Sequence, residues 1–155
     1  MKELYLFLTE LITSHDNSIF VDLYKSNHQQ DVITTPSVLI DISGINLREY
    51  KKDVLLAEVQ GKLHYLQDEY TDSDNQSNTQ QNSLMVLDNV QKLIGKIHLA
   101  SNNYFSQIQV RSIEQISEVT NVNTFVIGFS TYFLLKRDVL QNALITLNLQ
   151  ETVSY

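Results

Sequence analysis

The stretch that most constrains the fold is residues 53–70, where apolar and polar side chains alternate along the chain. Side chains on a β-strand point to opposite faces in turn, so a period of two predicts one long strand with a buried face and a wetter face. The rest of the chain has to supply the apolar layer that covers the buried face. The predicted buried face carries Leu55, Ala57, Val59, Gly61, Leu63 and Tyr65, and the wetter face carries Leu56, Glu58, Gln60, Lys62, His64 and Leu66.

Residues 122–135 predict a second long strand, the partner of the first in one sheet. Apolar side chains occur on both of its predicted faces, with Phe125 and Ile127 on one and Val126 and Leu134 on the other. Strands that are buried on both faces are typical of the centre of a sheet. We therefore expect this strand to be central, with a helix or another subunit over each side.

Shorter patterns complete the predicted fold. Apolar residues recur at three- and four-residue steps in residues 1–14 and 84–100, which predicts two amphipathic helices. We expect the first helix to cover the sheet of its own domain rather than a membrane or a partner. Residues 19–24, 37–43 and 108–119 predict further strands, the last with a bulge, and residues 44–52 predict a turn. The order predicts an α+β fold, an antiparallel or mixed β-sheet of about four to five strands flanked by two α-helices, with an extended C-terminal arm.

Residues 71–83 contain no apolar side chain, which predicts a mobile polar loop within the domain. Asp72 and Asp74 open like a calcium-binding loop. The sixth position is Ser77 instead of glycine, however, and the twelfth is Ser83 instead of glutamate. We therefore interpret the acidic residues as part of a solvated loop and expect no metal site.

The chain is expected to form a single domain over residues 1–135, followed by a C-terminal arm of residues 136–155. Leu140, Leu144, Leu147 and Leu149 give this arm apolar side chains without an obvious place to pack. Two interpretations remain open. The arm completes its own sheet as a short helix plus strand, or it adds to the sheet edge of a neighbouring subunit.

The charge balance argues against nucleic-acid recognition. The formal net charge is −7, with 11 Lys and Arg against 18 Asp and Glu. Binding to phosphates needs clustered basic residues, and the nearest approaches, residues 48–52 and 136–137, are short. An acidic surface suits a channel through which DNA passes without specific binding. No stretch approaches the ~20 apolar residues that cross a bilayer, so we expect no membrane partner.

No pattern in the sequence is typical of an active site. Cysteine is absent, which excludes thiolate metal sites and cysteine nucleophiles. The four histidines, His15, His28, His64 and His98, show no metal-ligand spacing. No glycine-rich phosphate loop and no serine-hydrolase elbow occurs. We therefore expect a protein that is not an enzyme and that needs no cofactor.

The order of elements resembles the tail terminator (tail completion) proteins of long-tailed bacteriophages. The resemblance rests on the helix of residues 1–14, the segment Thr-Pro-Ser-Val-Leu-Ile-Asp of residues 35–41, and the long strand of residues 54–70 with its polar extension. It continues through the helix of residues 84–100, Val110-Arg111-Ser112, and the closing strand that ends Tyr-Phe-Leu-Leu at residues 132–135. The resemblance spans nearly the whole chain, except that the C-terminal arm has no counterpart.

The resemblance implies a structural virion protein of the tail or neck, assembled in the host cytoplasm. Such proteins form a ring, commonly a hexamer, that caps the tail tube and joins it to the neck and head-completion proteins. DNA passes through the lumen. We expect the wetter face of residues 53–70 to make subunit contacts and acidic groups to face the lumen. The candidate residues for the subunit interface or the lumen are Glu58, Gln60, Lys62, His64, Asp68, Glu69 and Glu118.

Two other classes of function compete with this interpretation. A small non-catalytic adaptor, or another neck or tail protein, would bind a protein partner through a sheet edge or the apolar tail. A protein of that kind is expected to remain a monomer in dilute solution. An enzyme would instead show a deep pocket that gathers Asp, Glu and His side chains.

Overall fold

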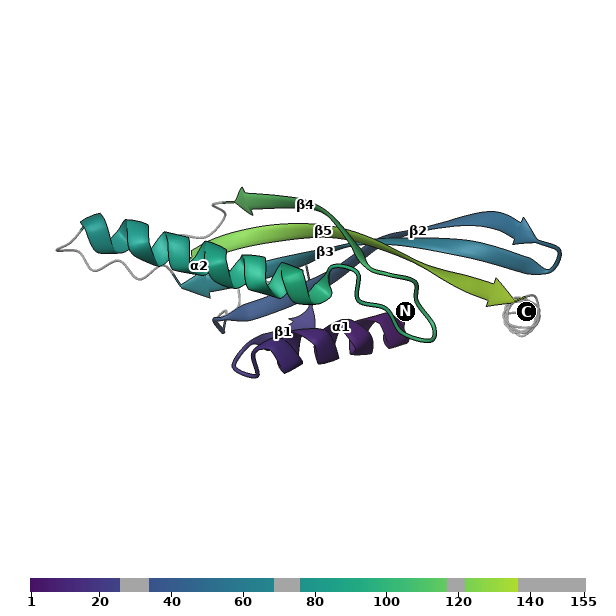
Figure 1. Cartoon of the computed structure of the whole chain (residues 1–155), viewed down its shortest axis with the longest axis horizontal. Helices are drawn as coiled ribbons and strands as arrows, with labels where there is room; N and C mark the ends of the chain where they lie inside the picture. Colours follow the sequence, from purple (N-terminus) through teal and green to yellow (C-terminus); the bar gives the residue numbers. More distant parts are fainter. Residues whose placement is uncertain (26–33, 69–75, 117–121, 137–155) are drawn as a thin grey trace, which may run out of the picture.

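The computed structural model describes residues 1–25, 34–68, 76–116 and 122–136, with the side chains of the second helix described from residue 84 onward. These ranges confirm the α+β class (Figure 1). Residues 137–155, which include almost all of the expected C-terminal arm, lie outside them, as do residues 71–75 of the expected polar loop. The elements in chain order are α1 (Lys2–His15), β1 (Phe20–Leu23), β2 (Ser37–Lys51), β3 (Val54–Asp68), α2 (Gln76–Ile97), β4 (Gln109–Ile116) and β5 (Val122–Lys136).

The strands form one five-stranded sheet in the order β1-β2-β3-β5-β4. β3 is the middle strand and pairs with β5 antiparallel along its whole length, from Val54 opposite Lys136 to Asp68 opposite Val122. The predicted pairing of the two long strands is therefore confirmed. β1 joins β2 in parallel, which makes the sheet mixed. The predicted bulge in β4 is also confirmed, between Val110 and Ser112.

Both helices pack on the same face of the sheet (Figure 1). α1 buries one side chain per turn, at Leu4, Leu8 and Ile12, as expected for a helix that covers its own sheet. Buried residues of α2 join the same cluster, and the predicted buried face of β3 supplies the opposing side chains. The core consists chiefly of Leu4, Leu8, Ile12, Val38, Ile40, Val59, Leu63, Tyr65, Val90, Leu93, Ile97, Phe125, Ile127 and Phe129.

Two predicted boundaries are wrong. α2 begins at Gln76, so residues 76–83 are helical, and residues 71–75 of the predicted loop lie outside the described ranges. Gln and Ser are compatible with a helix, but a run of polar residues shows no apolar period from which to recognise it. β2 continues to Lys51, so residues 44–51 form a strand rather than a turn. Pairing with β3 extends β2, and the chain reverses only at Lys52 and Asp53, where Asp53 has φ of 64°.

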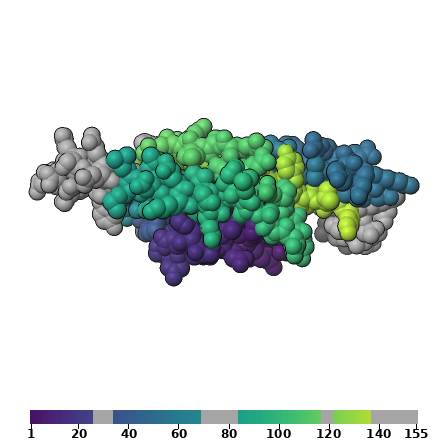
Figure 2. All heavy atoms as spheres, in the orientation of Figure 1, coloured from purple at the N-terminus to yellow at the C-terminus, as the bar shows by residue number. Residues whose placement is uncertain are grey.

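The β2–β3 hairpin projects past both helices, and we call residues 45–57 the hairpin extension (Figure 1). In the space-filling view the blue atoms of this hairpin form one end of the described part of the molecule (Figure 2). Its exposed apolar side chains are Ile45, Leu47 and Tyr50. The extension is thus a part of the sheet that neither α1 nor α2 covers, with the end of β5 paired to residues 54–57.

The sheet has two outer strands within the described residues. On one side, β1 pairs only with Ser37 to Ile40 of β2, so β2 itself is the outer strand from Asp41 to Lys51. On the other side, β4 is the outer strand and most of its side chains are exposed. None of the helices in the described ranges is long and apolar enough to span a membrane.

Candidate protein-interaction site

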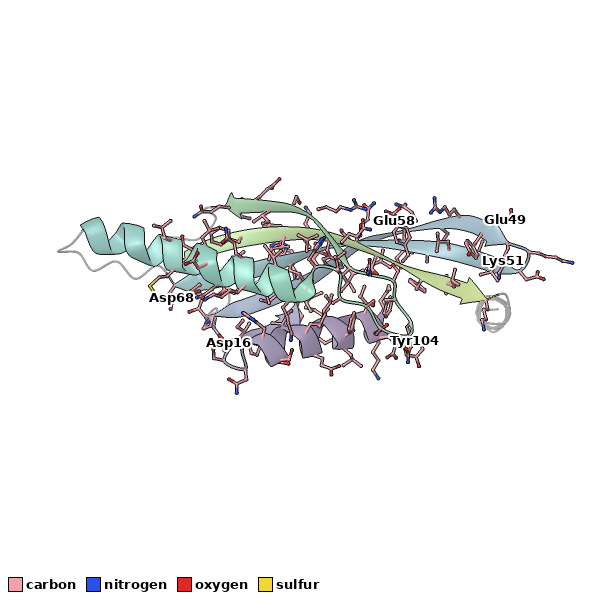
Figure 3. All side chains as sticks on the ribbon, in the orientation of Figure 1. Asp16, Glu49, Lys51, Glu58, Asp68 and Tyr104 are labelled. Atoms are coloured by element: carbon pink, nitrogen blue, oxygen red, sulfur yellow. The ribbon has the colours of Figure 1, made fainter. Side chains whose placement is uncertain are left out.

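The face of β3 opposite the helices is the candidate site. Because side chains alternate along a strand, burial of Val59, Leu63 and Tyr65 under the helices turns Glu58, Gln60 and Lys62 to the other side. Figure 3 shows Glu58 on the side of the sheet away from α1. We call this surface the open face, because within the described residues no helix covers it.

A groove of about 350 Å³ lies on the open face across four neighbouring strands, with Ser43 as the residue from β2. β3 supplies Glu58, Gln60 and Lys62, β4 supplies Arg111, and β5 supplies Ser130. Gly128, on β5, contributes to the floor of the groove. The groove therefore presents both charge signs on a surface of regular backbone, which suits contact with another protein surface.

Side-chain hydrogen bonds fix the walls of this groove. The Tyr132 hydroxyl donates to Glu58 Oε1 over 3.2 Å, and Arg111 Nε donates to Ser130 Oγ over 3.1 Å. The Arg48 guanidinium lies 6.0 Å from the centre of the Tyr132 ring, on the same face. These contacts hold three long side chains in place, so less conformational entropy remains to be lost when a partner binds.

The structure gathers three of the predicted site residues, Glu58, Gln60 and Lys62, in the groove. His64 lies further along the same face of β3, where its ring stacks on Tyr24 with centroids 4.2 Å apart. Asp68 is the last residue of β3 and is exposed. Glu69 and Glu118 lie outside the described residues. The role of these residues in subunit contact stays a prediction.

The sequence analysis did not select Arg111, Ser130 or Tyr132. Ser130 and Tyr132 lie on the strand face opposite Phe129, a position that the alternation in residues 122–135 already indicated. The position of Arg111 depends on the bulge between Val110 and Ser112, which shifts the register of β4 against β5. Alternation alone gives no way to infer such a shift.

Two ionisable groups outside the groove have shifted pKa values. Hydrogen bonds from the Ser18 hydroxyl (2.7 Å) and the Ser18 backbone N–H (2.9 Å) lower the pKa of Asp16 because they stabilise the carboxylate. Burial raises the pKa of Tyr65, and the negative charge of Asp16 adds to the effect. The Tyr65 hydroxyl donates to Gln67 Oε1 over 2.7 Å.

The raised pKa of Tyr65 predicts a loss of stability in alkali. The unfolded chain releases the phenolic proton at lower pH than the folded chain. The contribution of Tyr65 to the free energy of unfolding is therefore fully present below about pH 10, and it is lost as the pH rises through the pKa of the folded state. We expect Tyr65→Phe to lower the free energy of unfolding at neutral pH, through loss of the hydrogen bond to Gln67, and to reduce its fall in alkali. Urea unfolding at a series of pH values measures both effects. An unchanged alkaline fall in the variant would contradict the assignment to Tyr65.

Metal chemistry finds no support in the described ranges, where no group of three or more His, Asp and Glu residues could hold an ion. Asp72 and Asp74, the residues that open like a calcium loop, fall outside those ranges. The open face offers hydrogen-bonding groups and charges of both signs.

Comparison with known proteins leaves the family open. No protein-family model matches the chain, and no curated protein matches it. Among solved structures, a chain of the structure described as "Virion of native gene transfer agent (GTA) particle" is similar over 83% of this chain and 84% of that chain. The two share 7% sequence identity with a TM-score of 0.46. A likeness of this extent leaves the function to be argued from the surfaces of the chain itself.

Proposed function

We propose that this chain is a structural subunit of a phage-like virion. The chain assembles with copies of itself into a ring, which the resemblance to tail terminator proteins implies to be a hexamer. In this role the ring caps the tail tube, joins it to the neck and lets DNA pass through its lumen. The order of helices and strands resembles that of the tail terminator proteins. The proposal places the protein in the virion after assembly in the host cytoplasm.

The observation that carries the proposal is the hairpin extension. Ile45, Leu47 and Tyr50 are 45%, 53% and 57% exposed, on a hairpin that projects beyond the helices. Apolar side chains gathered on a projecting element are typical of a protein–protein contact. A closed ring needs two different complementary surfaces on every subunit, and we assign the extension to one of them.

The open face provides the second element of the proposal. Glu58 lies in its groove beside Lys62 and Arg111, and Asp68 lies at the end of the same strand, so the negative charge offered to a lumen is the net charge of the whole chain, −7. A ring multiplies this charge by its number of subunits. Negative groups along a lumen repel the phosphates of passing DNA, so the DNA moves without specific binding.

The test of this proposal is the mass of the full chain in solution. Light scattering over a concentration series, at low and high salt, is expected to show either a closed oligomer or a monomer that forms rings only with a tail tube protein. Electron microscopy of the same samples should then show rings with a central hole. Both measurements use the full chain without substitutions.

A different result would favour the adaptor interpretation. If the chain remains a monomer at all concentrations, and excess tail tube protein produces no ring, the ring proposal is wrong. Binding of a single protein partner in a fixed ratio would then identify the chain as an adaptor that uses a sheet edge.

A further inference from the structure

A second groove, of about 480 Å³, runs along the outer side of α1. Leu6 is 48% exposed there, and Tyr104 is 72% exposed. Phe7 and Leu11 are half-buried and form the floor, while Glu3 and Glu10 lie two helical turns apart and provide the carboxylates. We call this surface the α1 groove; its remaining lining residues are Ser14, Lys96 and Asn102.

The wall of the α1 groove is held in shape by hydrogen bonds. Asn102 Oδ1 accepts from the backbone N–H groups of Tyr104 and Phe105, both over 2.8 Å. Phe105 is buried, which anchors the loop that carries Tyr104. Figure 3 shows Tyr104 near the N-terminal end of α1. The groove is therefore preformed, so little conformational entropy is lost when a partner binds in it.

The hairpin extension has the complementary chemistry. Its apolar side chains are exposed, and Lys51 and Lys52 add two positive charges beside Tyr50, with Lys51 Nζ 5.7 Å from the centre of the Tyr50 ring. Glu49 is the carboxylate on the same face as Leu47. The extension thus carries three basic groups, Arg48, Lys51 and Lys52, and two carboxylates, Glu49 and Asp53. The α1 groove offers two carboxylates and one ammonium group, that of Lys96.

We propose that the hairpin extension of one copy docks into the α1 groove of a second copy of this chain. Ile45, Leu47 and Tyr50 then cover Leu6 and Tyr104, and the lysines of the extension lie near Glu3 and Glu10. The inference rests on the proposed function, because it names the contact by which subunits assemble. The two surfaces differ, so the contact is head-to-tail and leaves one extension and one groove open on every dimer until a ring closes.

A second copy is the occupant because the match is both apolar and electrostatic. In a chain of net charge −7, the extension carries one more basic than acidic group, and Lys51 and Lys52 are adjacent at the tip of this projecting element. Opposite charges that face each other guide encounter and fix register, while the apolar side chains supply most of the affinity. A contact of this composition weakens as salt concentration rises, but it does not vanish.

A charge exchange tests the contact. Glu10→Lys and Lys51→Glu each replace an attraction by a repulsion, so each variant alone should need about tenfold more protein to assemble at low salt. The chain that carries both substitutions should regain most of the lost assembly. Light scattering across a concentration series measures the effect, and circular dichroism checks that each variant is folded. Matched controls are Glu114→Lys on β4 and Lys92→Glu on α2, both exposed positions outside the two surfaces.

The absence of cysteine from the chain allows a second, direct measurement. A Leu47→Cys chain is mixed with a Tyr104→Cys chain under mild oxidation. With the two chains in equal amounts, random pairing gives twice as much mixed disulfide as either homodisulfide, and the expected yield of the mixed disulfide is well above this ratio. A yield at or below the random ratio would overturn the contact.

The outcomes separate this inference from the function on which it rests. If the unmodified chain assembles and the charge variants assemble equally well, the proposed contact is wrong and the ring remains. If the doubly substituted chain is folded but needs as much protein to assemble as the single variants do, the contact is also wrong. If the unmodified chain never assembles, either alone or with excess tail tube protein, both the contact and the proposed function fail.

Discussion

Replacement of Gly61 by valine is expected to lower the free energy of unfolding by about 2–3 kcal/mol. Gly61 lies on the buried face of β3, opposite Phe129 of β5 and Ile42 of β2. A Cβ atom at this position would be 2.5 Å from Phe129 Cζ and 2.7 Å from the Asp41 carbonyl oxygen. The ring of Phe129 can turn aside, but the backbone oxygen moves only with its strand. The higher strand propensity of valine offsets part of this cost.

Gly44→Val is the matched control, because it makes the same substitution further along the paired strands. An added Cβ at Gly44 meets nothing within 4 Å, and its backbone has an ordinary negative φ. The control is expected to change stability by less than about 0.5 kcal/mol. Urea unfolding of both variants, with the slope compared as well as the midpoint, measures the difference. Equal losses in the two variants would contradict the close approach at Gly61.

Leu63→Ala is expected to have a still larger effect, about 3–4 kcal/mol. Leu63 is fully buried at the middle of the central strand, between Ile40 of β2 and Ile127 of β5. Removal of its branched end leaves a space that strands paired on both sides cannot close. The loss therefore includes the cavity as well as the transfer of the missing carbons. Thermal and urea unfolding should agree on the size of the effect.

The control for Leu63 is Leu134→Ala on β5. Leu134 is 50% exposed, so truncation removes contacts with water more than contacts with the core. We expect a loss of under about 1 kcal/mol for this variant. If Leu134→Ala destabilises the protein as much as Leu63→Ala does, the core does not lie on the face assigned to it.

The central pair of strands was predictable from the sequence for a simple physical reason. A strand covered on one face must alternate, and a shift of one residue would move Leu63 and its neighbours to the wrong side. The alternation therefore fixes both the strand and its buried face. It also placed Glu58, Gln60 and Lys62 together before their neighbours were known.

The two wrongly predicted boundaries, the start of α2 and the end of β2, lie where the sequence shows no clear apolar period. Residues 76–83 are helical without an apolar period, and β2 beyond Gly44 is a strand because β3 pairs with it. The neighbours of the candidate site depend on register, which a single strand does not reveal. Arg111 reaches Ser130 only because β4 contains a bulge. Local pattern gives the face of a strand, and only the assembled sheet gives its neighbours.

The outer strands of the sheet bear on how subunits survive before they meet their partners. Exposed backbone at a sheet edge invites strands of other chains to add in any order, which leads to fibres. In this protein the outer part of β2 carries Asp41, Arg48, Glu49 and Lys51, and β4 carries Arg111 and Glu114. A strand that approaches either edge meets charges that it must pair or desolvate, and the bulge of β4 interrupts the ladder. Newly made chains are thereby less prone to add to one another edge to edge, which leaves a more specific contact, such as the proposed one, to select a neighbour.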